Sequence, residues 1–168
     1  QRGEVVATAA RPLFEAAELD RLPHAFDLLE WDAYRYFVLP GKRLGAVSTS
    51  RGCDKGCTFC SQQKFWERRW RARSPEAVVA EIELLRTSFG VEVVLITDDY
   101  PTLDRSRWER LLDLLIEKNL GVQLLMETRA ADIVRDEDIL PKYRRAGIIH
   151  IYVGTESTDP AALERMKK

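Results

Sequence analysis

The sequence has no long hydrophobic run, no excess of charge of either sign and only three cysteines among its 168 residues. No apolar stretch approaches the roughly 18 residues that a membrane-spanning helix requires, so the sequence predicts no membrane span. The 26 lysines and arginines nearly balance the 27 aspartates and glutamates, which gives no general support for binding to nucleic acid or a membrane surface. With 45% hydrophobic residues, the chain is predicted to fold around a core.

The cysteines are few and clustered: Cys53, Cys57 and Cys60 lie close together, and the rest of the chain has none. An odd, clustered set is a poor disulfide framework, which favours a reducing compartment and predicts a cytoplasmic protein. The sequence begins at Gln1 with neither an initiator methionine nor a signal peptide, so we expect it to be a piece of a longer chain.

Regular patterning begins at residue 44. Residues 1–43 are irregular and are predicted to be a linker with a helix near residues 12–22. Beyond them, short apolar runs alternate with helical periodicity, which is typical of βα units and a parallel sheet. Strands are expected at 44–49, 92–97, 122–127 and 148–153, followed in turn by helices at 75–89, 104–120, 136–146 and from 160 onward. The predicted fold class is α/β, with about four βα units of an incomplete (β/α)₆ barrel.

Charged side chains follow the predicted strands where each one ends. Asp98 and Asp99 come after the second strand, Glu127 and Arg129 after the third, and Glu156 after the fourth. Right-handed crossovers place the carboxyl ends of parallel strands on one rim. The cysteine loop follows the first strand, so the sequence predicts one site that combines the thiols with these charges.

The spacing of the cysteines suits a compact metal centre with one open coordination position. Gly52 and Gly56 allow the loop to bend tightly around the sulfur atoms. Structural zinc normally takes four protein ligands, and neither His24 nor His150 has metal-ligand spacing to the cysteines. An iron–sulfur cluster with an open iron is therefore favoured, with zinc as the alternative.

The Cys-x-x-x-Cys-x-aromatic-Cys loop after a first strand resembles the radical S-adenosylmethionine (radical SAM) superfamily, over residues 44–168. The resemblance implies an enzyme in which Cys53, Cys57 and Cys60 hold a [4Fe–4S] cluster and S-adenosylmethionine (SAM) chelates the fourth iron. An external electron donor reduces the cluster, and one electron then splits SAM into a 5′-deoxyadenosyl radical that abstracts hydrogen from a substrate. By the same analogy, Phe59 packs against the adenine; alternatively, it is a core aromatic behind the cluster.

Other rim positions correspond to SAM-binding positions of that family. Asp98 and Asp99 take the place of a Gly-Gly-Glu-Pro segment that receives the SAM amino group, although this chain lacks the glycines. The resemblance therefore assigns that role to Asp98, to Asp99 or to backbone carbonyls, and Asp99 could equally be a turn residue. Arg129 would meet the SAM carboxylate, with a surface salt bridge as the alternative. Glu156 would contact the ribose hydroxyls.

Further segments resemble the cobalamin-dependent branch, and most closely the anaerobic magnesium-protoporphyrin IX monomethyl ester oxidative cyclases: 60–66, 102–103, 128–129, 143–147 and 154–156. This resemblance implies a porphyrin substrate and a cobalamin cofactor. The chain has no Asp-x-His-x-x-Gly loop to ligate cobalt. Residues 1–43 are thus expected to be the tail of an upstream cobalamin-binding domain, and residues 44–168 the N-terminal part of the radical SAM core.

Two other functions stay open from the sequence. A cobalamin-dependent radical SAM methyltransferase would share every motif named above, whereas an iron–sulfur or zinc interaction module would bind metal without turnover. The stretch 64–73 interleaves basic and aromatic residues, which suits nucleic acid, an anionic macrocycle or a neighbouring domain. The balanced net charge makes nucleic acid the least favoured of these, and we expect no nucleic-acid partner.

Overall fold

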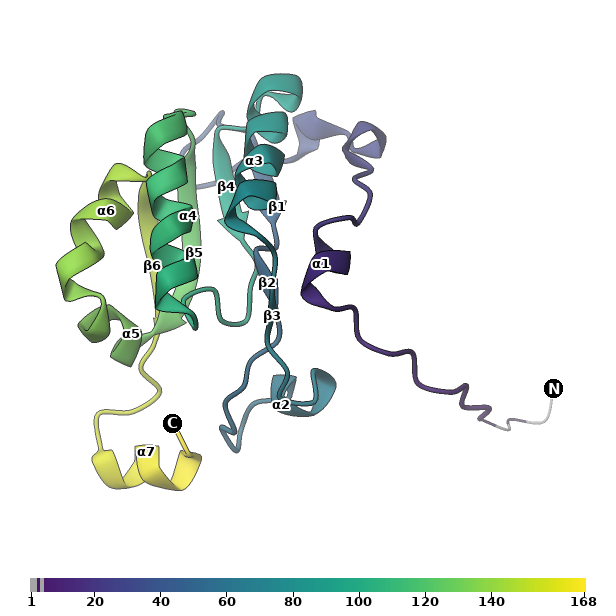
Figure 1. Cartoon of the computed structure of the whole chain (residues 1–168), viewed down its shortest axis with the longest axis vertical. Helices are drawn as coiled ribbons and strands as arrows, with labels where there is room; N and C mark the ends of the chain where they lie inside the picture. The colour runs from purple at the N-terminus through teal and green to yellow at the C-terminus, as the bar shows by residue number, and fades with distance from the viewer. Residues whose placement is uncertain (1–2, 4) are drawn as a thin grey trace.

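The computed structural model describes residue 3 and residues 5–168, so residues 1, 2 and 4 of the predicted linker lie outside the described residues. Four parallel strands form one sheet in chain order (Figure 1): β1 (Leu44–Val47), β4 (Val93–Ile96), β5 (Gln123–Arg129) and β6 (Ile148–Gly154). All four strands lie where the apolar runs predicted them. Strand β5 extends two residues further than expected, so Arg129 belongs to the strand itself.

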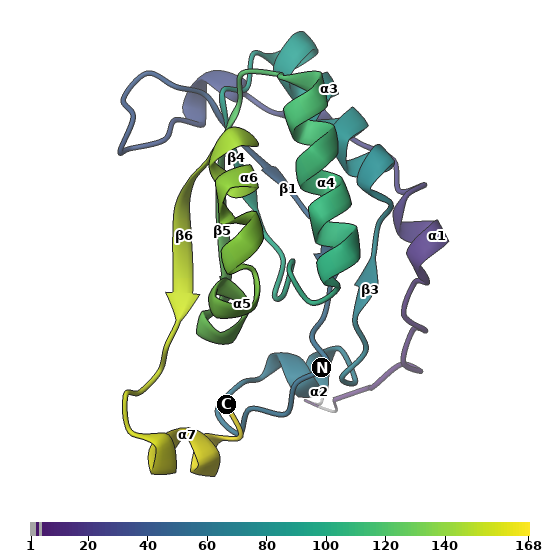
Figure 2. The ribbon, with the colours of Figure 1, turned by 60° about the vertical axis from the view of Figure 1, so that its left-hand side comes forward.

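Helices cover one face of this sheet (Figure 2): α3 (Pro75–Phe89), α4 (Arg105–Lys118) and α6 (Leu140–Arg145). The Ser74 hydroxyl caps α3 by accepting from the backbone N–H of Ala77, and the Asp104 carboxylate caps α4 in the same way. Their apolar sides and the facing side chains of β4 and β5 form the main core. Within the described part of the chain, no helix combines the length and apolarity that a membrane crossing would need.

The helix predicted at 136–146 is divided. A 3₁₀ turn spans Glu137–Ile139 and α6 begins at Leu140. A separate helix that was not predicted, α5 (Ala130–Arg135), follows β5 directly. Pro141 falls in the first turn of α6, where its missing N–H would have no helical partner, so it starts a helix instead of disturbing one. Helix α7 (Pro160–Met166) corresponds to the fourth predicted helix and lies close to its predicted position.

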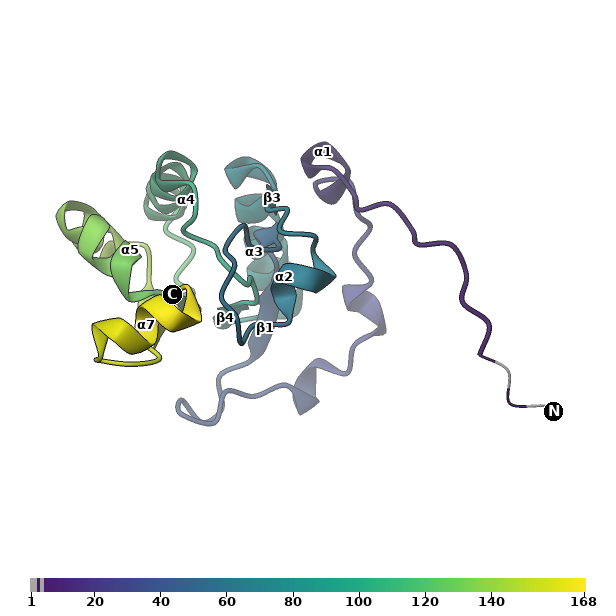
Figure 3. The ribbon, with the colours of Figure 1, turned by 90° about the horizontal axis from the view of Figure 1, so that it is seen from below.

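The cysteine loop lies between two short elements at the carboxyl end of the sheet. Strands β2 (Ser50–Arg51) and β3 (Arg71–Ala72) pair as an antiparallel ribbon, and the loop and α2 (Gln62–Phe65) are enclosed between them. Helix α7 lies beside this loop (Figure 3), and the Thr58 backbone N–H donates to the Met166 carbonyl at 2.9 Å.

Part of the segment predicted as a linker belongs to the sheet. The predicted helix near 12–22 is a single turn, α1 (Ala16–Leu19). Further along, Tyr36 N–H donates to Lys42 O, and Leu44 N–H donates to Tyr34 O, so residues 34–43 turn back beside β1. The Tyr36 ring packs on the sheet face opposite the helices. Residues 34–43, which we call the turn-back, therefore cover one end of the sheet face opposite the helices, which we call the inner face.

Candidate functional site

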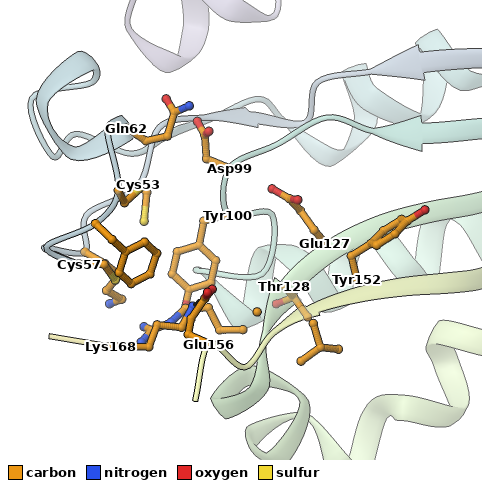
Figure 4. A pocket seen from close by; sticks show the side chains of 16 residues that line it. Cys53, Cys57, Gln62, Asp99, Tyr100, Glu127, Thr128, Tyr152, Glu156 and Lys168 are labelled. Atoms are coloured by element: carbon orange, nitrogen blue, oxygen red, sulfur yellow. Dashed lines mark hydrogen bonds and ion pairs between the residues drawn. The ribbon is translucent and has the colours of Figure 1, made fainter. Parts of the chain in front are cut away.

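A cavity of about 490 Å³ opens at the carboxyl ends of the strands. Figure 4 shows Cys53 and Cys57 on one side of it and Glu127, Thr128 and Tyr152 on the other. The predicted convergence on one rim is present for most of the residues singled out from the sequence: the cavity is lined by all three cysteines together with Phe59, Asp99, Arg129 and Glu156.

Local hydrogen bonds fold the cysteine loop. Cys60 N–H donates to Cys57 O at 3.1 Å, and the Gln63 side-chain amide donates to the same carbonyl at 2.9 Å. The backbone enters the loop at Gly52, whose N–H donates to the Asp99 carboxylate at 3.2 Å. Burial raises the pKa of the Cys53 thiol, against an opposing hydrogen bond from the Lys55 backbone.

The cysteines suit an iron–sulfur cluster by their chemistry and placement. All three are free thiols, and all face the same cavity. Among the residues that the structure describes, no three His, Cys, Asp or Glu side chains are grouped to hold a single metal ion. In a four-iron cluster each thiolate binds a different iron atom, so the cysteine sulfur atoms lie further apart than ligands that share a single metal ion. The histidines contact other groups: His24 faces Glu81, and His150 faces Tyr36.

The two acids after β4 have different surroundings. Asp98 is 2% exposed, and its carboxylate accepts hydrogen bonds from Thr49 N–H, the Thr49 hydroxyl and the Ser50 hydroxyl, each at 2.6 Å. Burial raises the pKa of Asp98, and these hydrogen bonds oppose the shift. Asp98 does not line the cavity, whereas Asp99 does. Of the two acids that the resemblance assigned to the SAM amino group, only Asp99 faces the cavity, whereas Asp98 holds the turn after β1.

Arg129 faces the cavity beside a buried tyrosine. Its guanidinium carbon lies 5.9 Å from the centroid of the Tyr100 ring, and the Lys55 ammonium lies 5.7 Å from the same centroid. Tyr100 donates its phenol proton to Asp132 at 3.0 Å, and burial raises its pKa to about 12. Arg129 lines the cavity and forms no salt bridge among the described residues, so its guanidinium is available to an anionic ligand.

Phe59 and Glu156 lie at the open side of the cavity. Phe59 is 54% exposed, so it is not the core aromatic that was its alternative assignment. Glu156 follows β6 in a left-handed conformation, and its carboxylate lies 3.3 Å from the Lys168 ammonium. Both side chains are accessible to a ligand that enters the cavity.

A model of the Radical SAM superfamily matches residues 47–168. The chain belongs to the radical SAM superfamily. Members of this superfamily are enzymes that use a [4Fe–4S] cluster and SAM. The match confirms the predicted family, and together with the four-stranded parallel sheet it confirms the predicted partial radical SAM barrel.

Similar proteins include cyclases and methyltransferases. The anaerobic magnesium-protoporphyrin IX monomethyl ester cyclase of Rubrivivax gelatinosus is 41% identical over 99% of this chain and 29% of its own length. The cytidylyl-2-hydroxyethylphosphonate methyltransferase of Streptomyces wedmorensis is 31% identical over 91% of this chain and 30% of its own. The radical SAM methyltransferase TsrM from Kitasatospora setae, solved with cobalamin and a [4Fe–4S] cluster, has a TM-score of 0.68 at 23% identity, over 74% of this chain and 24% of that one. This chain spans less than a third of each.

The sequence analysis did not single out two tyrosines that line the same cavity as the cysteines, which we call the cysteine cavity. These are Tyr100 and Tyr152. Tyr100 directly follows Asp99 beyond a buried strand, and that position could have indicated it. Tyr152 alternates with His150 along β6, which puts both on one face of the strand. A test for period-two alternation on the last strand would have found that pair.

Proposed function

We propose that this chain is the cluster- and SAM-binding part of a radical SAM enzyme. The observation that carries the proposal is that three thiols from one loop share a cavity with charged side chains from the ends of β4, β5 and β6. Cys53, Cys57 and Cys60 would hold a [4Fe–4S] cluster. When bound, that cluster would supply one electron to split SAM into a 5′-deoxyadenosyl radical.

Each of the cavity residues would bind a different part of SAM, according to its charge or shape. Arg129, which lines the cavity without an ion-pair partner among the described residues, would bind the carboxylate as a charge-assisted pair. Asp99 would accept hydrogen bonds from the amino group, since its carboxylate stands at the entrance of the cysteine loop. Glu156 would accept from ribose hydroxyls, and the exposed ring of Phe59 would pack on the adenine.

For the substrate, we propose a porphyrin that undergoes oxidative ring closure in (bacterio)chlorophyll-type tetrapyrrole synthesis. The support is 41% identity to a cyclase across nearly the whole chain. The likeness of fold to a structure that holds cobalamin supports cobalamin as a second cofactor, bound by a domain other than the one described. An external electron donor would reduce the cluster. A cytoplasmic location fits these oxygen-sensitive groups.

A cobalamin-dependent radical SAM methyltransferase is the second candidate, and a relative that is 31% identical and is named a methyltransferase favours it. The two reactions differ in their products. A methyltransferase converts SAM to S-adenosylhomocysteine and adds a methyl group to its substrate, whereas the cyclase leaves the substrate with an additional ring. Analysis of both products by mass spectrometry separates the candidates.

The test is anaerobic reconstitution of the full-length protein with iron and sulfide, followed by reduction in the presence of SAM. We expect bound iron and release of 5′-deoxyadenosine, and we expect Cys57→Ala to lose both. Ser61→Ala, in the same loop, is the matched control and should retain both. One bound zinc with no iron would instead support an interaction module and contradict the proposal.

A further inference from the structure

A second cavity, of about 530 Å³, lies on the inner face of the sheet. Its walls are mainly apolar or aromatic, and they include Tyr36, Phe37, Leu95, Leu125 and Tyr152. The charged side chains that line it are Arg35, which is paired with Asp32, and Glu127. A cavity of this size with few polar groups is typical of a small-molecule site in which the polar groups fix the orientation of the ligand.

One wall of this inner cavity is held in place by contacts between rings. The Tyr36 hydroxyl lies 3.2 Å from Nδ1 of His150, and Tyr36 is only 4% exposed. The His150 ring stacks on Tyr152, with centroids 4.4 Å apart and an angle of 15° between the planes. These contacts join the turn-back of residues 34–43 to β6. The wall is thus ordered before any ligand arrives, which lowers the cost of binding a flat molecule.

The inner cavity adjoins the cysteine cavity, and the two share lining residues. Glu127 and Tyr152 are partners in the β5–β6 register, and both line both cavities. Figure 4 shows these two side chains together on the side of the cysteine cavity away from Cys53. A ligand in the inner cavity would therefore present one end to the site where SAM is proposed to bind.

Glu127 is the acid at this junction, and the described residues provide it with no hydrogen bond and no ion pair. Burial raises its pKa, and the negative charges of Asp99 and Asp98 raise it further. The Glu127 side chain is exposed, so it is accessible to a ligand in either cavity. A polar group on a ligand would supply the missing partner.

We infer that the inner cavity binds the substrate as a flat, largely apolar ring against Phe37 and Tyr152, and that Glu127 hydrogen-bonds a polar substituent at its reacting end. The inference rests on the proposed radical SAM function and assigns the substrate-binding residues that the function leaves open. Phe37 is 82% exposed although it is aromatic, and a ring bound in the cavity would cover it. Glu127 is then the residue that selects which end of the substrate faces the cysteine cavity.

Binding is tested on the full-length, reconstituted protein without reductant, so that no turnover occurs. The probe is magnesium-protoporphyrin IX monomethyl ester, titrated by fluorescence. We expect Phe37→Ala to weaken binding about tenfold, because an aromatic contact is lost. Phe14→Ala, an exposed ring outside the cavity, is the matched control and should bind as the wild type does. Equal affinities of the two variants, or no binding by the wild type, would overturn the inference.

The role of Glu127 is tested by coupling. With reductant present, the tetrapyrrole consumed per 5′-deoxyadenosine released should fall about tenfold or more in Glu127→Gln. Glu117→Gln, on the exposed side of α4, should leave this ratio unchanged. A ratio in Glu127→Gln equal to that of the control contradicts the assignment of Glu127.

The readouts separate this inference from the proposed function. Release of 5′-deoxyadenosine by the wild type without probe binding leaves the radical SAM function standing and removes the inner cavity as the tetrapyrrole site. Binding that depends on Phe37 without any release of 5′-deoxyadenosine gives the opposite result. If another segment of a longer chain fills the cavity, the probe fails to bind and the inference is wrong.

Discussion

Gly52 allows the backbone to enter the cysteine loop with φ at +89°, and a Cβ atom there would lie 2.2 Å from the carbonyl oxygen of Arg69. Both the dihedral angle and the overlap with backbone oppose any side chain. We expect Gly52→Ala to lower the free energy of unfolding by about 3 kcal/mol. Urea denaturation followed by circular dichroism measures this value.

Gly121 provides the control for that substitution. It also has a positive φ, +66°, but no heavy atom lies within 4 Å of a Cβ built there. Gly121→Ala should therefore lose only the dihedral contribution, about 1 kcal/mol. Equal losses in the two variants would show that the contact with Arg69 has no energetic weight.

Tyr100 predicts an effect of alkaline pH on stability. Burial raises the pKa of its phenol from 10.0 to about 12 in the folded protein, so between these values the unfolded state releases a proton that the folded state keeps. Stability must fall as pH rises through this window. We expect Tyr100→Phe to reduce that fall and, at neutral pH, to cost about 1–2 kcal/mol because Asp132 loses a donor.

Thermal unfolding between neutral pH and pH 12 tests this expectation, with Tyr34→Phe as the control at an exposed position. Burial also raises the pKa of Tyr143, so part of the alkaline loss should remain in Tyr100→Phe. An alkaline profile of Tyr100→Phe that matches the wild type would contradict the proposed contribution.

The neighbouring acids Asp98 and Asp99 show what the sequence can predict at the scale of one residue. Their position after a buried strand predicted the rim, and both lie there. Which of the two faces the cavity depends on Thr49 and Ser50, almost fifty residues earlier in the chain, whose hydroxyls and N–H bind Asp98. Such a distant pairing leaves no local pattern in the sequence.

At the scale of elements, α3 is fastened to the β2–β3 ribbon by a buried ion pair. The Arg73 guanidinium contacts the Glu81 carboxylate, and both side chains are at least nine-tenths buried. Arg73 also donates to Ser48 O at 2.9 Å. Removing Glu81 leaves the buried Arg73 with only its longer ion-pair contact to Asp20, at 3.7 Å, so we expect Glu81→Ala to lower the free energy of unfolding by about 3 kcal/mol.

Glu83, two residues along the same helix, supplies the comparison. Its carboxylate pairs with Lys118 at 2.9 Å, but both side chains are substantially exposed. Glu83→Ala should cost less than about 1 kcal/mol, because solvent screens the pair. Urea midpoints of the two variants measure the difference, and a loss for Glu81→Ala as small as that for Glu83→Ala would refute the role of the buried pair.

The elements that the sequence predicted well have local signals at their ends. Ser74 and Gly90 bound α3, and Asp104 caps α4, each with the geometry that its residue type favours. Helix α5 was missed because it begins at Ala130, directly after β5, and its N-cap residue Arg129 makes no capping side-chain hydrogen bond. Without a capping residue or a glycine between them, the sequence does not indicate where a strand ends and the following helix begins.

At the scale of the whole molecule, the four-stranded parallel sheet followed from the alternation of apolar runs and helical periodicity. The inner cavity, in contrast, could not be predicted from these patterns. Its wall depends on Tyr36 meeting His150, 114 residues later in the chain, and residues 34–43 contain no pattern that predicts their return to β1. The placement of the cysteine cavity was predictable because it depends only on strand direction. The shape of the inner cavity depends on contacts between distant segments.

Thr49, between β1 and β2, is where three distant segments of the molecule meet. Asp98 accepts hydrogen bonds from its N–H and hydroxyl, and Arg107 of α4 donates to its carbonyl at 2.7 Å. The two opposite charges also stabilise each other's ionised form. Because both side chains hold the same residue, Asp98→Asn and Arg107→Ala should not act independently. We expect an interaction energy of about 1 kcal/mol or more in a double-mutant cycle.

Urea unfolding of the wild type, the two single variants and the double variant measures this energy. The control cycle combines Asp98→Asn with Arg110→Ala, because Arg110 is also on α4 but pairs with the exposed Glu76. That pair should be additive within about 0.5 kcal/mol. Additivity in both cycles would mean that α4 and β4 support Thr49 separately. Coupling in the first cycle alone would mean that the helix layer and the sheet jointly fix the start of the cysteine loop, three residues before Gly52.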